Sequence, residues 1–302
     1  MDKGQSEKYQ QALQLMAEEK WLDSAVILED LINESPNDDV NRHLVRALYE
    51  AKQYQRAFVY FVEQPLAFTE TYSEACLGVQ LMLHNQSYMA ARQFIVELPT
   101  AWQGPLRRDV SEAEMAADQK YRVTIQTLLR SFYHLGDCSL SEQQERLSEA
   151  QQLPLNDYLT GAQFLLRDPF THELIKASII DTLRQATVNK ELTLQWIDKQ
   201  DYQINPSQLQ AIDDLPVVKE LRQELNRRLG SKNPTQFQLA SQELQLQLML
   251  LYPLIEEKVT SPGEWIDYLI DKISGKKEDK KNPVGPLQDT LTEIIDDLSE
   301  KH

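Results

Sequence analysis

Apolar residues recur along most of this chain at intervals of three and four, the spacing that places side chains on one face of an α-helix. Glycine, which disfavours helix interiors, occurs only 9 times in 302 residues. Short segments rich in Pro, Asn, Asp, Ser and Gly interrupt the pattern and predict the turns. We therefore predict an all-α protein with helices at residues 5–19, 22–34, 38–51, 54–64, 70–84, 87–98, 111–135, 141–151, 155–167, 170–186, 206–229, 234–252, 261–274 and 286–299.

One stretch, "ELTLQWIDKQDYQIN", alternates with a period of two instead. Leu192, Leu194 and Trp196 alternate with more polar residues, and a second alternating stretch follows the polar "DKQ". This pattern predicts a β-hairpin that pairs residues 191–197 with 201–205. Because a hairpin of two strands is barely stable alone, we expect it to pack on neighbouring helices.

The chain contains an internal repeat in its first hundred residues. Residues 54–68, "YQRAFVYFVEQPLAF", align without a gap with residues 88–102, "YMAARQFIVELPTAW", at a shift of 34. Paired helices at this period are typical of tetratricopeptide repeats, in which a small alanine lets the two antiparallel helices approach closely. A looser copy surrounds Ala25, which stands 32 residues before Ala57. The matching positions of the two clearer copies are Tyr54 and Tyr88, Ala57 and Ala91, and Pro65 and Pro99.

Beyond residue 110 the period fades but paired helices continue. The segment "LTGAQFLLRDPFTHELIKASIIDTLRQATV" consists of a helix, an Asp-Pro turn and a second helix with small residues, and it resembles a HEAT-type pair. We therefore predict a right-handed α-solenoid with a small β-hairpin insert. Tetratricopeptide-like repeats occupy residues 1–105. Additional helical pairs, which are HEAT-like, occupy residues 106–273, with the hairpin near 191–205.

A last amphipathic helix is predicted at residues 286–302, after a polar linker at 274–285. A helix this short is marginal by itself in water, so we expect it to dock on an apolar surface. Our hypothesis is that this surface belongs to the same molecule, on the last solenoid helix around Trp265, Ile266 and Leu269. The alternatives are a second copy, a partner, or a disordered acidic tail that does not dock. The helix carries the apolar stripe Leu287, Leu291, Ile294, Ile295 and Leu298, and the linker carries Lys276, Lys277, Lys280 and Lys281.

Composition limits the partners and the location. The net charge of -16 disfavours nucleic acid and anionic membranes, which are bound by clustered Lys and Arg. No apolar run approaches a membrane span and the N-terminus has no apolar signal region, so we expect a soluble, cytoplasmic protein. Cys76 and Cys138 are far apart in the sequence and are expected to be free, buried thiols in a reducing compartment.

No catalytic or metal-binding pattern stands out. The chain lacks an HExxH motif, a Cys/His cluster, a glycine-rich phosphate loop and a GxSxG elbow. Its adjacent acidic pairs diverge on a helix, which makes them poor candidates for paired acid–base work. We expect a protein that is not an enzyme and that uses no metal or cofactor.

The predicted repeats offer a binding surface, because the first helix of each tetratricopeptide pair lines a concave groove. Arg42 and Arg46 lie one helical turn apart, so they either fork onto a ligand carboxylate or are ordinary solvated or ion-paired arginines. Tetratricopeptide proteins that bind chaperone tails use a dicarboxylate clamp, which needs Lys and Asn at set groove positions. This chain has Ser73, Cys76 and Gln80 at those positions of its third repeat, so we do not expect such a clamp. Counting back from the repeat alanines Ala57 and Ala91 gives the groove-facing positions Asp39, Arg42, Arg46, Tyr49, Ser73, Cys76, Gln80 and His84. All of these except Cys76 are the predicted peptide-binding residues.

The whole arrangement resembles a family of cytoplasmic tetratricopeptide proteins of low-GC Gram-positive bacteria. The matching parts are the N-terminal repeats, "LLRDPFTHELIKASIIDTLRQ", the hairpin leading into "INPSQL", and "NPTQFQLASQELQLQLMLLYP", which together cover most of residues 5–273. The resemblance implies this fold and a cytoplasmic location. The function we expect is a non-catalytic adaptor that binds a protein or peptide in its groove; the alternative is an intracellular receptor for a short signalling peptide.

Overall fold

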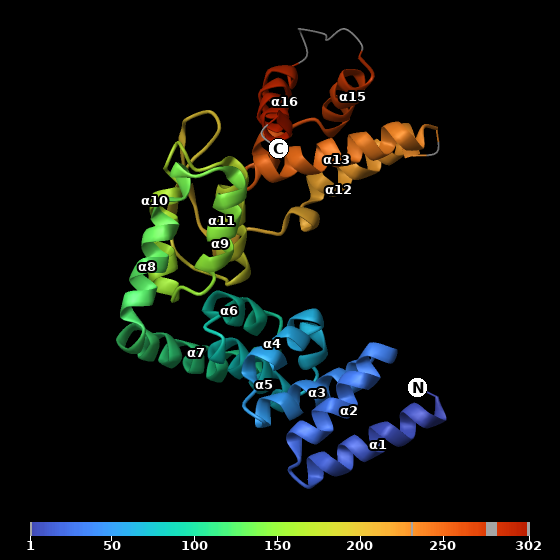
Figure 1. The fold of residues 1–302 in the computed structure, drawn as a ribbon. Coiled ribbons are helices and arrows are strands. Elements are labelled where there is room, and N and C mark those ends of the chain that lie inside the picture. The colour runs from blue at the N-terminus through green and yellow to red at the C-terminus, as the bar shows by residue number, and fades with distance from the viewer. Residues whose placement is uncertain (1, 231, 276–282, 301–302) are drawn as a thin grey trace. The chain divides into compact units, whose positions relative to one another are not determined.

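The structure is a computed structural model that describes residues 2–230, 232–275 and 283–300, and the side chains of this set up to residue 296. It is 75% helical, with 16 α-helices and one antiparallel sheet of two strands in the described part (Figure 1). The predicted all-α class is confirmed. The chain forms two compact units: unit 1 is Met1–Leu165 with Gln185–Thr187, and unit 2 is Leu166–Arg184 with Val188–His302.

Unit 1 is a series of helices in which most helices pack against the next one along the chain. Each predicted helix of the repeat region is present, with ends within about two residues of the prediction. The helices are α1 (Lys3–Ala17), α2 (Trp21–Glu34), α3 (Asp38–Glu50), α4 (Tyr54–Glu63), α5 (Tyr72–His84), α6 (Tyr88–Val96), α7 (Thr100–Lys120), α8 (Arg122–Tyr133), α9 (Leu140–Ala150) and α10 (Leu155–Leu165), with short 3-10 turns at Pro65–Phe68 and Leu135–Asp137.

Local sequence explains where these helices begin. The side chain of Asn37 accepts hydrogen bonds from the first backbone N–H groups of α3, and Thr71 does the same for α5. Asp2 and Ser139 form capping boxes before α1 and α9. Each cap satisfies donors that the first turn of a helix leaves unpaired.

The three repeat alanines all lie at tight contacts between helices. Ala25, Ala57 and Ala91 are 1%, 0% and 0% exposed. In the same helix as Ala57, the buried ring of Phe61 packs edge to face against Phe68 and Phe94. Small side chains at these positions let the backbones approach, and the aromatic rings fill the remaining space.

One predicted helix, 111–135, is wrong in its boundaries. The structure has α7 from Thr100 to Lys120 and α8 from Arg122, so the segment "LPTAWQGP" is largely helical despite Pro105. Proline inside a helix costs about 3 kcal/mol, and full burial of Leu106 and Val110 on the same helix offsets that cost. The break at Tyr121 has no Gly or Pro to mark it, so the sequence pattern does not show it.

Unit 2 contains the predicted β-hairpin. Leu192 pairs with Ile204 and Leu194 with Tyr202 in an antiparallel register, which confirms the prediction. The elements of unit 2 are α11 (Glu173–Gln185), β1 (Leu192–Gln195), β2 (Asp201–Ile204), α12 (Pro216–Leu225), a π-turn (Asn226–Gly230), α13 (Pro234–Leu251), α14 (Ile255–Lys258), α15 (Pro262–Ile273) and α16 (Gly285–Glu300), with 3-10 turns at Pro206–Gln208 and Ile212–Asp214.

The hairpin is attached to the rest of unit 2 through side chains of both strands. Leu192 and Leu194 are buried, and the Nζ of Lys176 in α11 donates to the carbonyl of Gln195 at 3.2 Å. Lys258 lies over the rings of Trp196 and Tyr202, with its Nζ 4.9 Å and 4.7 Å from the two centroids. These contacts supply the support that two isolated strands lack.

The predicted helix at 206–229 is wrong over its first half. Two 3-10 turns occupy the start, and α12 begins only at Pro216. Leu215 is extended, as expected for a residue that precedes proline. The short helix α14 was not predicted.

The last helix of the chain, α16, packs against α13 of the same unit. Val284, Leu291 and Ile295 are buried, whereas Leu287 and Ile294 are partly exposed. The side-chain placement of Leu298 and the lysines of segment 276–282 lie outside the described residues. In the described part of the chain, no helix combines the length and apolarity needed to span a bilayer. Cys76 and Cys138 are free as predicted, but both are half-buried rather than buried.

Candidate functional site

The predicted peptide-binding residues lie on two helices of unit 1, α3 and α5, which contact each other (Figure 1). Across this contact, the Nη2 of Arg46 donates to the hydroxyl of Ser73 at 3.3 Å. Further along, the rings of Tyr49 and His84 meet edge to face with centroids 5.8 Å apart. The structure therefore brings together residues that are about 30 positions apart in the sequence. We call Arg46, Tyr49, Ser73, Gln80 and His84 the α3/α5 surface.

Arg42 is held by its own chain. Its guanidinium pairs with Asp39, with Glu70 at 3.0 Å and with Glu74 at 3.5 Å, and it also donates to the carbonyl of Ala67 at 3.0 Å. Its side chain is only 15% exposed. Burial alone lowers the pKa of Arg42, but the hydrogen bonds to carboxylates outweigh burial and raise it. Arg42 therefore braces α3 against the segment that leads into α5.

Arg46, one turn further along α3, differs from Arg42. Within the described residues it forms no ion pair, and it donates a hydrogen bond to the hydroxyl of Ser73. It is half-buried, which limits the freedom of its side chain. Of the two arginines that the sequence singled out, Arg46 is the one that remains available to a carboxylate.

An aromatic cluster lies at the other end of the α3/α5 surface. The ring of His84 stacks on Tyr54 with centroids 3.8 Å apart and planes 4° from parallel, and Tyr49 meets Tyr54 edge to face at 5.3 Å. Partial burial lowers the pKa of His84, which favours the neutral form of its ring. Partial burial also raises the pKa of Tyr49. The faces and edges of these three rings form a surface suited to apolar or aromatic side chains.

Similar contacts join α3 to α1 and α5 to α7, and the sequence pattern did not pair the residues that make them. The hydroxyl of Tyr9 in α1 lies 3.0 Å from Nδ1 of His43 in α3. The rings of Tyr72 in α5 and Trp102 in α7 meet edge to face with centroids 5.9 Å apart. The groove positions were counted only from Ala57 and Ala91, so they fall in α3 and α5. Tyr9 lies in α1, outside that count, which is why the repeat pattern did not identify it.

The described residues also bear on metal binding. Among them, no group of three or more His, Cys, Asp or Glu side chains lies close enough to hold an ion. The chemistry that the α3/α5 surface can perform is recognition: Arg46 can donate to a carboxylate, the hydroxyl of Ser73 and the amide of Gln80 can hydrogen-bond, and the ring cluster can stack.

The fold and this surface define an all-α protein with a cation and an aromatic cluster arranged along two adjacent helices. No protein-family model, no curated protein and no solved structure matches the chain. The ligand of the α3/α5 surface is therefore inferred from the chemistry of its own residues.

Proposed function

We propose that the chain is a non-catalytic adaptor that binds a protein or peptide on the α3/α5 surface, within an α-solenoid whose first part is tetratricopeptide-like and whose later part is HEAT-like. Two features support this arrangement of the first part. The repeat alanines Ala25, Ala57 and Ala91 fall in α2, α4 and α6, one in each second helix of a pair. The first helices α3 and α5 contact each other, as do α5 and α7.

The observation that carries the proposal is the contrast between Arg42 and Arg46. Three carboxylates of the same chain surround Arg42, whereas Arg46 donates to the hydroxyl of Ser73. A half-buried guanidinium beside neutral donors is a suitable site for a ligand carboxylate, which it can bind through two parallel hydrogen bonds. Because α3 and α5 are held in place by their buried faces, little ordering cost is paid on binding.

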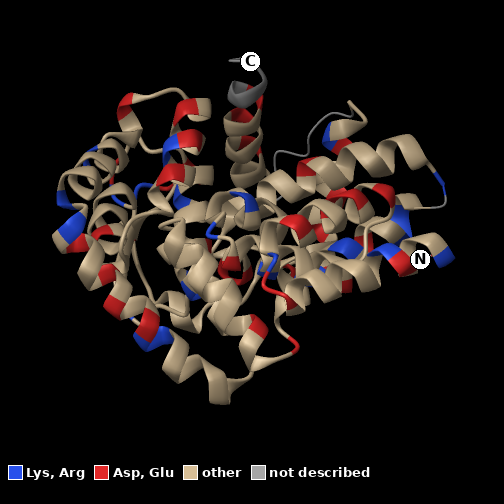
Figure 2. Cartoon of the chain, turned by 60° about the horizontal axis from the view of Figure 1, so that its bottom comes forward, with Lys and Arg blue, Asp and Glu red and all other residues tan. Residues whose placement is uncertain are grey.

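The ligand that fits best has one carboxylate and one apolar or aromatic side chain. The carboxylate would bind Arg46 and Ser73, and the ring would lie on His84 and Tyr54. Figure 2 shows that acidic and basic residues are interspersed along the helices, and the acidic excess gives the chain a net charge of -16. A ligand with many further negative charges would be repelled, so we propose a segment with few of them, encountered in the cytoplasm.

The test is affinity capture followed by direct binding. The full-length chain is used to capture partners from a cytoplasmic extract, each candidate is identified and purified, and its binding is measured by calorimetry. We expect Arg46→Ala and His84→Ala each to weaken binding by about tenfold or more, the effect of losing one charge-assisted or stacked contact. Arg56→Gln is the matched control, because Arg56 is an exposed arginine of α4 in the same unit, paired with Glu29.

Equal affinity of the wild-type, Arg46→Ala and His84→Ala proteins for the purified partner would refute the proposed surface. Copurification of a peptide of a few residues, with no protein partner, would instead support a receptor for a short signalling peptide. Retained secondary structure by circular dichroism shows that each variant is folded before its affinity is compared.

A further inference from the structure

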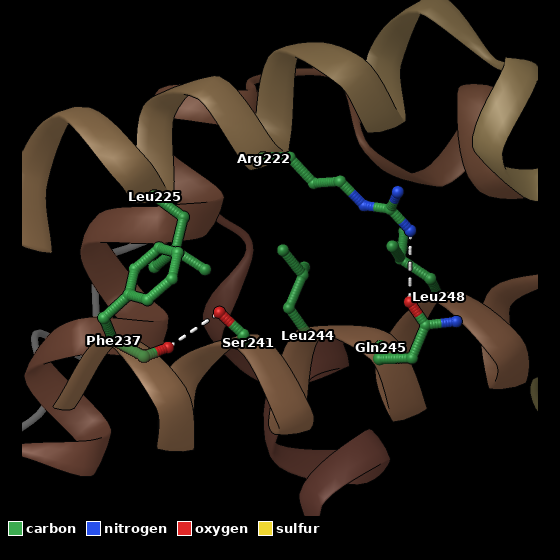
Figure 3. Close-up of a pocket in the computed structure, with 7 residues that line it drawn as sticks. All are labelled: Arg222, Leu225, Phe237, Ser241, Leu244, Gln245 and Leu248. Carbon is green, nitrogen blue, oxygen red and sulfur yellow. Dashed lines mark hydrogen bonds between the residues drawn. The ribbon is translucent and has the colours of Figure 1, made fainter. Parts of the chain in front are cut away.

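Unit 2 contains a pocket between α12 and α13, far in sequence from the α3/α5 surface. Its cavity volume is ≈ 230 Å³. Three of the side chains that line it, Leu225, Leu244 and Leu248, are at most 2% exposed. The residues that line it are Arg222, Leu225, Phe237, Ser241, Leu244, Gln245 and Leu248 (Figure 3).

The pocket has an apolar end and a polar end. Figure 3 shows Leu225 and Phe237 together at one end, and Arg222 and Gln245 together at the other. Leu244 lies between them and points into the space. The hydroxyl of Ser241 donates to the carbonyl of Phe237 at 2.7 Å, so its hydrogen is already used and that end of the pocket gains no free donor.

The polar end retains donors. The Nη2 of Arg222 donates to Oε1 of Gln245 at 3.2 Å and to Asp213 at 2.5 Å. Both recorded bonds use the same nitrogen, which leaves the hydrogens of Nε and Nη1 for a ligand. Gln245 accepts through its oxygen, so its amide hydrogens are also available. Asp213 is 69% exposed, and an exposed pair of this kind contributes little, so it does not block a second anion.

The surroundings of the pocket are locally basic in an acidic protein. The segment 216–232, which holds α12 and the π-turn, contains five basic and two acidic residues, against a net charge of -16 for the chain. The π-turn follows α12 directly after the pocket residue Leu225. Single π-turns are frequent at functional sites, and a local excess of cations attracts an anion to its binding site.

We propose that this pocket binds a small aliphatic carboxylate, with its chain between Leu225, Phe237 and Leu244 and its carboxylate on Arg222 and Gln245. A heavy atom of such a chain fills about the space of one water molecule, about 30 Å³, so the cavity holds roughly seven or eight heavy atoms. This number matches the seven alkyl carbons of octanoate, whose carboxylate would lie at the exposed polar end, where the side chain of Arg222 is 46% exposed. The site is independent of the proposed adaptor function and lies on the other unit.

The probe is octanoate, titrated into the full-length protein by calorimetry and followed by amide chemical shifts. We expect saturable binding at one site, with shifts centred on α12 and α13. Octanol has the same chain without the charge, and we expect it to bind at least about tenfold more weakly, which corresponds to about 1.4 kcal/mol. Binding of octanol and octanoate with equal affinity would overturn the role of Arg222.

Three variants locate the site. We expect Arg222→Gln to weaken octanoate binding about tenfold, and Ser241→Leu to abolish it by filling the cavity. Arg227→Gln is the matched control, since Arg227 is an exposed arginine of the adjacent π-turn that is paired with Glu224 and does not line the pocket. Gln245→Glu places a negative charge at an exposed position of the polar end, and we expect it to abolish octanoate binding as well. This variant replaces Ser241→Leu if Ser241→Leu proves unstable. Absence of saturable binding, or unchanged binding in Arg222→Gln and Gln245→Glu, would overturn the proposal.

Discussion

The side-chain amide of Gln288 in α16 donates a hydrogen bond of 2.8 Å to the backbone carbonyl of Trp265 in α15. Both residues are fully buried. The indole Nε1 of Trp265 in turn donates to Gln247 of α13 at 3.0 Å, so three helices meet at this point. Because these bonds are shielded from water, they define one position of α16 on unit 2.

The apolar contact of α16 can be tested at Leu291, which is 0% exposed. Replacing it with alanine removes buried methyl groups and leaves a cavity, so we expect Leu291→Ala to lower the free energy of unfolding by about 2–5 kcal/mol. Urea unfolding followed by circular dichroism measures the change. Glu293→Ala, at an exposed position of the same helix, should stay within about 0.5 kcal/mol of the wild type. Equal stabilities of the two variants would show that α16 does not pack in solution as it does here.

Two glycines should respond to alanine with opposite signs. A Cβ on Gly161 in α10 would overlap the ring of Phe132 in α8, so we expect Gly161→Ala to cost about 1–3 kcal/mol. A Cβ on Gly104 in α7 would meet nothing within 4 Å, and alanine is the better helix former, so we expect a gain of about 0.5–1 kcal/mol. Thermal unfolding of both variants measures the two signs. A loss of stability in Gly104→Ala would contradict the helical assignment of residues 100–110.

The ion pair between Arg92 and Glu114 joins α6 to α7 with little exposure. Two hydrogen bonds link them, at 2.9 Å and 2.6 Å, and Glu114 also accepts from the backbone N–H of Leu155 at the start of α10. We expect Arg92→Met to cost about 3–5 kcal/mol, because it leaves the Glu114 carboxylate buried without its cation. The double variant with Glu114→Gln should cost less than the sum of the two single changes, which a double-mutant cycle measures. Strict additivity would show that the two side chains do not interact.

Glu243 of α13 gives a pH dependence to unit 2. Burial raises its pKa, and the nearby Asp296 adds to the effect, while hydrogen bonds from Gln247 and Thr292 oppose it. A raised pKa means that the folded state holds this proton at a higher pH than the unfolded state does. The group therefore costs stability at neutral pH, and the cost disappears as the pH falls through the raised pKa towards the ordinary value of 4.5.

We expect Glu243→Gln to be more stable than the wild type at pH 7, since the amide keeps the hydrogen-bond acceptor without the buried charge. The difference in melting temperature should shrink as the pH approaches 4.5. All other titrating groups are common to both proteins and cancel in the difference. A constant difference over this range would mean that the carboxylate of Glu243 is not shielded.

The sequence predicts most of the helices of unit 1 because their signals are local. A cap such as Asn37, a repeat alanine such as Ala57 and an apolar stripe act within one helix or between a helix and its neighbour in the chain. The prediction fails where a distant contact outweighs the local signal. Pro105 is accommodated inside α7 because Leu106 and Val110 are buried, and the sequence pattern alone does not report that burial.

The candidate sites show the same limit. Sequence places Arg42 and Arg46 as equivalent positions one turn apart, but only the folded chain surrounds Arg42 with Glu70 and Glu74 and leaves Arg46 beside Ser73. The pocket of unit 2 carries no sequence signal, because Arg222 and Gln245 are 23 residues apart and belong to different helices.

The sequence by itself determined the helical class, the repeat, the hairpin and the amphipathic last helix, since each is a periodicity that one or two adjacent elements express. The tertiary structure alone decided that Arg46 rather than Arg42 remains available to a ligand, that α16 packs against α13, and that a pocket lies between α12 and α13. Those outcomes depend on which helices meet in space, and a side chain's partners there come from residues that no local period connects.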